Sequence, residues 1–490
     1  MKYFIGADLG TSSLKLILCD KEGRLIASVL RTYDVKYPAP GFSEQDPYDW
    51  WEAFASGVKE LTEKVDRSKI VALGVAGQMH GLVILDENDR VIRPAILWND
   101  GRTWKETDYL NESIGKDALT DMTANIAFAG FTAPKLLWLK NNEPGNFCMI
   151  NKIMLPKDYI NYRLTGVHSC DYSDASGMLL LDVENKCWSK GMLEILGIDE
   201  KLMPTLFESY ERIGTLLPCV AKELGLPEGV VVAGGAGDNA GAAIGTGTVG
   251  NGKCNISIGT SGTVFVSSDK FVCDKENALH YFCHADGKYH IMGCMLSAAS
   301  CNKWFCDNVL RTNDYARVQN NVDTESLGKN NVYFLPYLMG ERSPINDTDA
   351  TGVFIGLRLN TTAEDMLLAI MEGVSFAIRD NLEVVGAMGV PIKEATVCGG
   401  GAKSELWLNI LANVLGIDLC VGESEEGPAM GAAFLAMLAS GELSSIDELP
   451  RFPIKARVSP TKELTESYNQ RYAKFKKIYP ATKELYKEIR

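Results

Sequence analysis

Apolar residues cluster in short runs at the start of the chain, and tight polar turns separate these runs. Residues 3–8 and 14–19 are apolar runs joined by a turn rich in glycine, serine and threonine at 9–13. A third run near 24–32 follows the turn at 21–23. Short apolar segments with such turns between them predict three consecutive strands in an antiparallel meander.

The next periodic segment has the spacing of an amphipathic helix. Residues 47–65 begin with a proline directly after Asp46, which is the arrangement expected where a capped helix starts. An apolar run at 70–76 then returns to a strand pattern. Because strands and helices alternate, we predict an α/β fold built from layers of sheet and helix. The apolar residues at helical spacing are Trp50, Trp51, Phe54, Val58 and Leu61.

One short motif occurs twice in the chain. Residues 7–17 (ADLGTSSLKLI) and 256–266 (ISIGTSGTVFV) both place Gly-Thr-Ser between two predicted strands. Repetition predicts two related halves, although a match this short can also arise by chance. The stretch at 233–252, rich in glycine and alanine, is the natural boundary between them. We therefore predict domains of residues 1–246 and 247–490.

Charge and cysteine usage narrow the functional class. The chain has 490 residues and a formal net charge of -14, and an acidic surface argues against binding to nucleic acid or to anionic membranes. Its 13 cysteines include no CxxC pair, which favours reduced thiols in a cytoplasmic protein. No secretory signal pattern is visible, and Asp238 and Asn239 interrupt the apolar stretch 229–250, so we expect no membrane span. The Lys/Glu-rich segment 462–490 predicts a terminal helix.

The first turn carries groups that suit a metal-bound phosphate. Asp8 comes at the end of a predicted strand, where a carboxylate can hold hydrated Mg²⁺. The glycine that follows lets backbone N–H groups approach an anion closely. Thr11 and Ser12 add hydroxyl donors. The alternative is an ordinary hairpin turn with an exposed aspartate.

Two further glycine turns add to this hypothesis. Gly259, Thr260 and Ser261 repeat the first turn, and two such loops that face each other can enclose a triphosphate. Residues 399–402 (Gly-Gly-Gly-Ala) lie between a predicted strand and a predicted helix, an arrangement that allows close approach to a phosphate or a flat ring. The alternatives are a β-turn for the former and tight backbone packing for the latter. The chain contains neither a Walker loop nor a dinucleotide-binding fingerprint.

Two segments offer side chains for the acceptor of a phosphoryl group. Asp238 lies among small residues, where a substrate can approach, and a carboxylate is needed to orient an acceptor hydroxyl and take its proton. Asp238 could instead cap a helix. Gln78, Met79 and His80 follow the strand at 70–76 and are flanked by glycines, a setting in which they can contact a sugar. Asp100 lies in a polar and aromatic loop of the kind that sugar sites use. The alternatives are a structural role for His80 and a solvent-facing loop with an Asp–Arg pair for Asp100.

Together and in this order, these motifs resemble the FGGY family of carbohydrate kinases, within the actin, Hsp70 and hexokinase-like ATPase superfamily. The most specific patterns are GFTAPKLLWL at 130–139 and GVFIGL at 352–357. The resemblance covers nearly the whole chain. It implies two ribonuclease-H-like domains with the active site in the cleft between them. It also implies ATP, Mg²⁺ and a small sugar as ligands, and it leaves a homodimer open.

The resemblance implies a role for each candidate residue. Asp238 is the expected catalytic base, and Asp8 is the expected ligand of Mg²⁺. The phosphate contacts are expected from Thr11, Ser12, Gly259, Thr260 and Ser261, the adenosine contacts from Gly400, Gly401 and Ala402, and the sugar contacts from Met79, His80, Asn239, Gln78 and Asp100.

The identity of the sugar rests on a finer resemblance. GQMHG at 77–81 and FLPYLMGERSP at 334–344 are similar to segments of family members that phosphorylate a ketopentose, so the expected reaction is transfer of phosphate from ATP to D-xylulose. Met79 and His80 stand where glycerol-phosphorylating members usually carry Arg-Glu. Ribulose, fuculose, gluconate, glycerol and a tetritol stay open as substrates. Outside the family, the alternatives are a non-sugar actin/Hsp70-like ATPase and a sugar-binding regulator.

Overall fold

The first half of the chain is built on a mixed sheet of seven strands. The computed structural model describes residues 2–422, 426–451 and 453–489. The strand order is β13-β14-β5-β1-β2-β3, and β15 pairs with β5 as well, on the same side as β14. The predicted meander is confirmed, because β1, β2 and β3 pair antiparallel in succession. The strands are β1 (Tyr3–Leu9), β2 (Ser13–Asp20), β3 (Leu25–Thr32), β5 (Ile70–Gly77), β13 (Arg212–Thr215), β14 (Val231–Ala233) and β15 (Ala236–Gly237).

The second half repeats this sheet. Its order is β18-β19-β17-β16-β22-β23-β24. Strand β16 pairs antiparallel with β17 and parallel with β22, as β1 does with β2 and β5. The predicted two related halves are therefore confirmed by topology. The strands are β16 (Cys254–Ile258), β17 (Gly262–Ser268), β18 (His280–Cys283), β19 (Tyr289–Met295), β22 (Glu394–Cys398), β23 (Asp418–Gly422) and β24 (Ile454–Val458).

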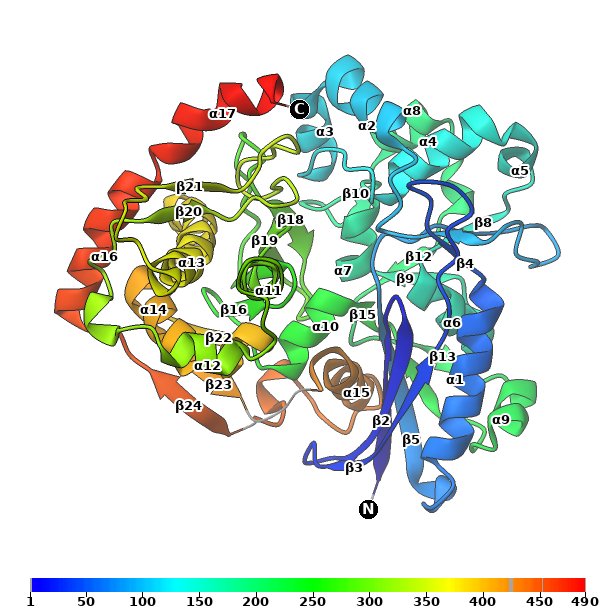
Figure 1. Cartoon of the computed structure of the whole chain (residues 1–490). Helices are drawn as coiled ribbons and strands as arrows, with labels where there is room; N and C mark the ends of the chain where they lie inside the picture. Colours follow the sequence, from blue (N-terminus) through cyan, green and yellow to red (C-terminus); the bar gives the residue numbers. More distant parts are fainter. Residues whose placement is uncertain (1, 423–425, 452, 490) are drawn as a thin grey trace.

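Helices cover both faces of the first sheet. On one face lie α1 (Pro47–Leu61), α6 (Pro156–Thr165) and α9 (Pro218–Leu224), whose apolar side chains form one core with the sheet. As predicted, α1 begins after Asp46, whose side chain accepts a hydrogen bond from Tyr48 N. The opposite face carries α10 (Asp238–Gly245) and α15 (Gly427–Ala439), so a helix from the second half packs on the first sheet (Figure 1).

Helices α10 and α15 occupy equivalent positions in the two halves, and they cross at glycines. A Cβ added to Gly431 of α15 would lie 1.8 Å from the carbonyl oxygen of Gly241 in α10. A Cβ added to Gly245 of α10 would lie 2.1 Å from the carbonyl oxygen of Gly427. The two halves therefore meet backbone to backbone, which only glycine permits. The predicted boundary at 246/247 stays a prediction; it falls in the link between α10 and β16.

The second sheet is covered by α13 (Ala363–Ala387) and α14 (Glu405–Leu415), and α16 (Lys462–Phe475) packs on α14. The single terminal helix predicted for 462–490 is wrong, because α16 ends at Phe475 and α17 (Ile478–Glu488) follows it. Pro480 explains the break: its ring would clash with the carbonyl of the residue four positions earlier in a continuous helix.

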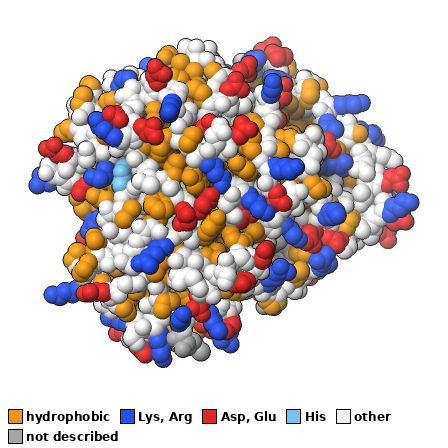
Figure 2. Space-filling view, turned by 180° about the vertical axis from the view of Figure 1, so that it is seen from behind, with side chains coloured by type: hydrophobic (Ala, Val, Ile, Leu, Met, Phe, Trp, Pro, Cys, Tyr) orange, Lys and Arg blue, Asp and Glu red, His pale blue; other side chains and the backbone are white. Residues whose placement is uncertain are grey.

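The remaining described elements are short. Most of those between β5 and β13 form the lobe at the upper right of Figure 1. None of the helices in the described ranges combines the length and apolarity needed to cross a membrane. On the face shown in Figure 2, acidic and basic side chains are interspersed. The short elements are β4 (Glu44–Gln45), β6 (Val83–Leu85), β7 (Ala95–Ile96), β8 (Lys152–Met154), β9 (Ser169–Asp171), β10 (Leu181–Asp182), β11 (Cys187–Trp188), β12 (Thr205–Phe207), β20 (Tyr333–Leu335), β21 (Val353–Ile355), α2 (Trp104–Asp108), α3 (Lys116–Thr123), α4 (Thr132–Asn142), α5 (Pro144–Cys148), α7 (Tyr172–Ala175), α8 (Lys190–Leu196), α11 (Ala299–Trp304) and α12 (Tyr315–Asn320).

Candidate active site

Two carboxylates flank the end of the central strand β5. Asp8 on β1 is in register with Ala76 of β5, and Ala236 of β15 is in register with the same Ala76 on its other side. Asp238 follows two residues later, as the first residue of α10. Because β1 and β15 both run parallel to β5, the two aspartates lie at the same edge of the sheet, where these strands end. Residues 230 positions apart in sequence are neighbours for this reason.

The charge of Asp238 influences the titration of Asp8. Burial raises the pKa of Asp238 to about 6, against two hydrogen bonds from Asn239 that lower it. Burial also raises the pKa of Asp8 to about 7, with a further contribution from the charge of Asp238 and an opposing one from Lys15. Because Asp238 loses its proton first, its charge acts on Asp8.

Asp238 presents one oxygen that is free for a ligand. Its Oδ1 accepts hydrogen bonds from Asn239 N at 2.7 Å and Asn239 Nδ2 at 2.9 Å. No described residue donates to its Oδ2, and the side chain stays partly exposed. The alternative of a helix cap does not hold, because Gly237 occupies the cap position and Asp238 lies inside the helix.

The first turn is held from outside and leaves its hydroxyls accessible. Gly10 N donates to Ser13 O at 3.0 Å, which closes the turn. Tyr33 OH donates to Gly10 O at 2.6 Å, and the exposed Trp98 donates from Nε1 to Thr11 Oγ1 at 2.9 Å. Ser12 is exposed at the tip. The turn is thus rigid in its backbone and open on one side.

The second turn and the third glycine cluster lie side by side. Strands β16 and β22 are parallel, with Ser257 opposite Cys398, so the turn after β16 meets the loop after β22. A Cβ added to Gly399 would lie 2.7 Å from Ile258 O, and one added to Gly401 would lie 2.5 Å from the Ile258 side chain. Thr260, Ser261 and Gly400 are exposed, Gly259 and Ala402 are half-buried, and Gly401 is buried. As predicted, strand, glycine loop and helix follow in order.

Met79 and His80 follow strand β5, and the Met79 side chain lies against Gly237, the residue before Asp238. The Met79 side chain fits against two glycines, and a Cβ added to Gly237 would lie 2.9 Å from it. His80 Nδ1–H donates to Gly177 O at 2.6 Å, and its ring stacks on Phe131 with 4.6 Å between centroids. Burial lowers the pKa of His80 to about 3, so the ring is neutral and Nε2 carries a lone pair for a hydroxyl.

Lys135 holds the backbone of His80 through a hydrogen bond. Its fully buried amino group donates to His80 O at 2.8 Å and to Gly130 O at 2.7 Å, and burial lowers the pKa of Lys135 well below its ordinary value. These bonds hold His80 in the left-handed backbone region, at φ 68°, which a side chain other than glycine rarely adopts. Conformations of this kind persist where the surroundings over-determine them, commonly at ligand sites.

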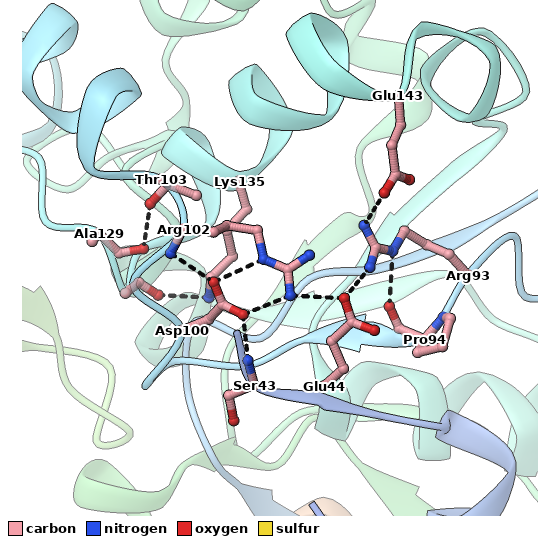
Figure 3. A network of polar contacts seen from close by, with 11 residues as sticks. Ser43, Glu44, Arg93, Pro94, Asp100, Arg102, Thr103, Ala129, Lys135 and Glu143 are labelled. Carbon is pink, nitrogen blue, oxygen red and sulfur yellow. Dashed lines mark hydrogen bonds and ion pairs between the residues drawn. The ribbon is translucent and has the colours of Figure 1, made fainter. Parts of the chain in front are cut away.

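Gln78 and Asp100 are buried and engaged with protein groups. Gln78 Nε2 donates to Gln45 Oε1 at 3.2 Å. Asp100 accepts hydrogen bonds from Ser43 N and from three nitrogens of Arg102, at 2.6 to 2.9 Å (Figure 3). These four donors occupy the lone-pair positions of the carboxylate. The geometry therefore favours a role for Asp100 in holding its loop over the direct sugar contact expected from the sequence.

Arg342 is a candidate site residue for which sequence analysis predicted no role. Its guanidinium lies over the Phe128 ring, 5.0 Å from the centroid, and no described carboxylate forms an ion pair with it. Ser343 N donates to Cys294 O at 2.9 Å, which ties this segment to β19. Burial raises the pKa of the Cys294 thiol, Arg342 lowers it, and the charges of Glu341 and Asp238 raise it, so Arg342 and Asp238 both lie within electrostatic reach of this thiol. The segment FLPYLMGERSP carried the signal, without indicating which residue matters.

The described residues contain no cluster of three or more His, Cys, Asp or Glu side chains arranged to hold a metal ion by themselves. Asp8 is nevertheless suited to Mg²⁺, because its carboxylate is partly exposed and no described residue donates a hydrogen bond to it. Magnesium commonly binds through one or two carboxylates, with substrate phosphates and water completing its shell.

Comparison with known proteins places this arrangement in a family. The N-terminal domain of the FGGY family of carbohydrate kinases matches residues 3–245, and its C-terminal domain matches 254–440. The chain therefore belongs to the FGGY family of carbohydrate kinases. It is 42% identical over 480 residues to the xylulose kinase of Escherichia coli, with 97% of this chain and 98% of that protein covered.

Solved structures agree with the fold in detail. The crystal structure of a "xyloylose kinase" from Brucella ovis superposes with a TM-score of 0.95 at 38% identity, covering 99% of this chain and 100% of the other. The crystal structure of a gluconate kinase from Lactobacillus acidophilus superposes with a TM-score of 0.93 at 27% identity, covering 100% of both chains. The predicted fold of two ribonuclease-H-like domains is confirmed. The fold is shared by kinases that act on different sugars.

Proposed function

We propose that this carbohydrate kinase transfers the γ-phosphate of ATP to a hydroxyl of xylulose, with D-xylulose 5-phosphate as the product. The identity to the Escherichia coli xylulose kinase over nearly the whole chain supports the choice of sugar. The observation that carries the chemistry is the free Oδ2 of Asp238, at the same sheet edge as the unpaired carboxylate of Asp8.

Asp238 acts as the base in this proposal. Its Oδ2 orients the acceptor hydroxyl and takes its proton as the new P–O bond forms. A pKa of about 6 leaves it mainly ionised at neutral pH and still basic enough to accept a proton. The two bonds from Asn239 fix the other oxygen, so the carboxylate cannot rotate freely.

The sugar contacts are assigned to the surroundings of Asp238. His80 Nε2 accepts a hydrogen bond from one sugar hydroxyl, since Nδ1 is committed to Gly177 O. Met79 packs on the carbon skeleton, and Asn239 is a third contact. The half-exposed indole of Trp98 donates a hydrogen bond to Thr11 and forms the wall of the sugar site on the side of the first turn.

The nucleotide contacts are assigned to the three glycine loops. Thr11 and Ser12 on one side and Gly259, Thr260 and Ser261 on the other donate to the phosphates, and Gly400, Gly401 and Ala402 approach the adenosine. When bound, Mg²⁺ supplies positive charge that offsets the charge developing on the β- and γ-phosphates. Asp8 is the residue that would hold it.

A substrate panel tests this proposal. ADP release from Mg-ATP is measured with D-xylulose, L-xylulose, D-ribulose, L-ribulose, L-fuculose, glycerol, erythritol and gluconate, with a control that lacks sugar. The proposal expects D-xylulose to give the highest kcat/KM. A higher value for another sugar refutes the substrate assignment, and ADP release that no sugar stimulates refutes the kinase assignment.

Gluconate is the second candidate substrate. Arg342 has no ion-pair partner among the described residues, and a sugar acid would supply a carboxylate for it. The likeness to the gluconate kinase structure gives the same candidate. In the panel, gluconate separates from xylulose by its kcat/KM in the wild type and by its dependence on Arg342.

A homodimer is also proposed, and the edge strand β3 supports it. Leu25, Ile26 and Leu30 are exposed on this strand, and an apolar edge strand is a surface that proteins commonly cover. Light scattering at micromolar concentration should then give twice the chain mass of 53.6 kDa. A mass of one chain across the concentration range contradicts a dimer.

A further inference from the structure

A buried charge cluster lies next to the segment that leads into Asp238. Its centre is Lys157, whose Nζ is 2.6 Å from Asp158 Oδ1, 3.0 Å from Asp171 Oδ1 and 3.8 Å from Asp174 Oδ2. All four side chains are buried almost completely. Burial alone would lower the pKa of Lys157, but the carboxylates raise it well above its ordinary value, so the ammonium stays charged. The mechanism proposed above uses none of these residues.

The cluster is connected to the backbone next to Asp238 through one serine. Asp171 Oδ2 accepts a hydrogen bond from Ser173 Oγ at 2.5 Å. Ser173 Oγ in turn accepts from Gly237 N at 3.2 Å. The hydroxyl has a single proton, which it gives to the carboxylate, so its lone pairs face the amide. The chain Lys157–Asp171–Ser173 thus ends on the residue that precedes Asp238.

The same cluster holds the start of this segment. Lys157 Nζ lies 3.4 Å from Gly234 O, and Asn161 Nδ2 donates to that oxygen at 2.9 Å. Strand β15 itself has only two residues, each paired with β5. Two strand residues give a weak constraint. Backbone hydrogen bonds from Gly234 N to Glu211 O and from Gly235 N to Ser209 O hold the start of the segment 234–237, and side chains from α6 and α7 add contacts at both of its ends.

The contact between the cluster and the base runs through backbone groups. Burial raises the pKa of Asp174 well above its ordinary value, against the charge of Lys157, which lowers it, and with contributions from the neighbouring carboxylates, including Asp238. The hydrogen bonds of the cluster reach Gly234 O and Gly237 N, at the two ends of the segment before Asp238.

We propose that Ser173, held by Asp171 and Lys157, is a positioning residue for the base Asp238. By fixing the Gly237 amide, it fixes the start of α10 and directs Oδ2 of Asp238 toward the acceptor hydroxyl. This inference rests on the proposed role of Asp238. Loss of the Ser173 hydroxyl misaligns the Asp238 carboxylate for proton transfer. It leaves the binding of sugar and nucleotide intact, because Ser173 contacts neither ligand in this proposal.

The chain offers a matched control in Ser209. Ser209 Oγ also donates to Asp171 Oδ2, at 2.7 Å, and it is equally buried. Unlike Ser173, its hydroxyl makes no contact with Gly237. Ser173→Ala and Ser209→Ala each remove one hydrogen bond to the same carboxylate, but only Ser173→Ala releases the amide before Asp238.

The test compares kcat, KM and Tm of both variants with whichever sugar the wild-type enzyme phosphorylates best. The expected result is a kcat about 10- to 100-fold lower for Ser173→Ala, KM for the sugar within about 3-fold of wild type, and kcat of Ser209→Ala within about 2-fold. Ser173→Thr keeps the hydroxyl and should recover most of the kcat. If Ser173→Ala does not fold, Ser173→Thr and Ser209→Ala are each compared with wild type. Ser173→Thr should then keep most of the wild-type kcat, and Ser209→Ala should stay within about 2-fold of it.

Equal kcat values for Ser173→Ala and Ser209→Ala overturn the proposal, as does a Ser173→Ala defect confined to KM. A loss of Tm in both variants without a difference in kcat assigns the cluster to stability alone and also overturns it. Because the assay uses the best sugar of the panel, a wrong substrate assignment leaves this test intact. If Ser173→Ala loses kcat but Asp238→Asn stays active, the assignment of Asp238 as the base is refuted.

Discussion

The charge of Asp238 raises the pKa of Asp8, although Asp8 lies on β1 and Asp238 follows β15, on the opposite side of β5. Both carboxylates sit at one sheet edge, and neither forms an ion pair among the described residues. Two like charges that act on each other favour a cation or a proton between them. A metal-bound phosphate next to a hydroxyl supplies both, which is the requirement of a phosphoryl transfer site.

Activity should depend on the ionisation of Asp238. Since the base must be deprotonated, kcat/KM should rise with pH and level off above an apparent pKa near 6. Asn239→Ala removes the side-chain bond that lowers this pKa, so its rising limb should move to higher pH. The pH profiles of both enzymes, measured with saturating Mg-ATP, provide the check. A limb that stays in place in Asn239→Ala contradicts the assignment.

Removal of the base should abolish most of the turnover. Asp238→Ala is expected to lower kcat by several orders of magnitude, because neither alignment nor proton acceptance remains. Binding of ATP, measured by calorimetry, should change little. Asp269→Ala is a surface control for loss of one carboxylate and should keep wild-type kcat. More than roughly a tenth of wild-type kcat in Asp238→Ala would contradict the role of Asp238.

The raised pKa of Asp238 also predicts a change in stability. The folded state binds a proton between the ordinary value of 3.8 and about 6 that the unfolded state has lost, so stability from this group falls as pH rises through that window. Asp238→Asn should therefore raise Tm at pH 8 and have less effect at pH 4. Asp199, whose pKa is lowered by hydrogen bonds from Lys201, has the opposite sign. Thermal unfolding of Asp199→Asn should show a loss at pH 8.

Arg342 should control sugar binding. Arg342→Met keeps the apolar stem over Phe128 and removes the guanidinium, so we expect KM for the sugar to rise by about 10-fold or more, as expected for a lost charged hydrogen bond. Arg342→Lys should recover part of this loss. Calorimetric binding of the sugar separates affinity from turnover. Unchanged KM values in Arg342→Met for both xylulose and gluconate would show that the guanidinium does not reach the sugar.

Much of the fold was predictable because local patterns decide it. The meander, α1 after Asp46, and the two Gly-Thr-Ser turns follow from short apolar runs and turn chemistry. The topological repeat of the second sheet confirms what the short sequence match at 7–17 and 256–266 indicated. The prediction of one terminal helix was wrong because Pro480 interrupts the helix, although the apolar residues keep a helical spacing on both sides of it.

The arrangement of the site was less predictable, since it depends on contacts between distant segments. Asp100 and its partner Arg102 lie in one polar loop by sequence, but only the fold brings Ser43 N to the Asp100 carboxylate. Arg342 was visible only as part of the segment FLPYLMGERSP at 334–344, and Ser173 carried no predicted role. Their neighbours Phe128 and Gly237 are far away in sequence, so neither spacing nor composition could reveal what they contact.

The crossing of α10 and α15 should be the most sensitive packing point between the two halves. In Gly431→Ala the new Cβ would lie 1.8 Å from Gly241 O, so the helices must separate, at a cost of about 1–3 kcal/mol or more. Since α10 begins with Asp238, kcat should fall together with the apparent Tm. Gly386→Ala is the matched control, because it lies in α13 with nothing within 4 Å of an added Cβ. That variant should gain about 0.5–1 kcal/mol through helix propensity and keep its activity. Thermal unfolding and steady-state kinetics of both variants decide the matter, and a Gly431→Ala enzyme as stable and active as Gly386→Ala would show that the crossing tolerates a side chain.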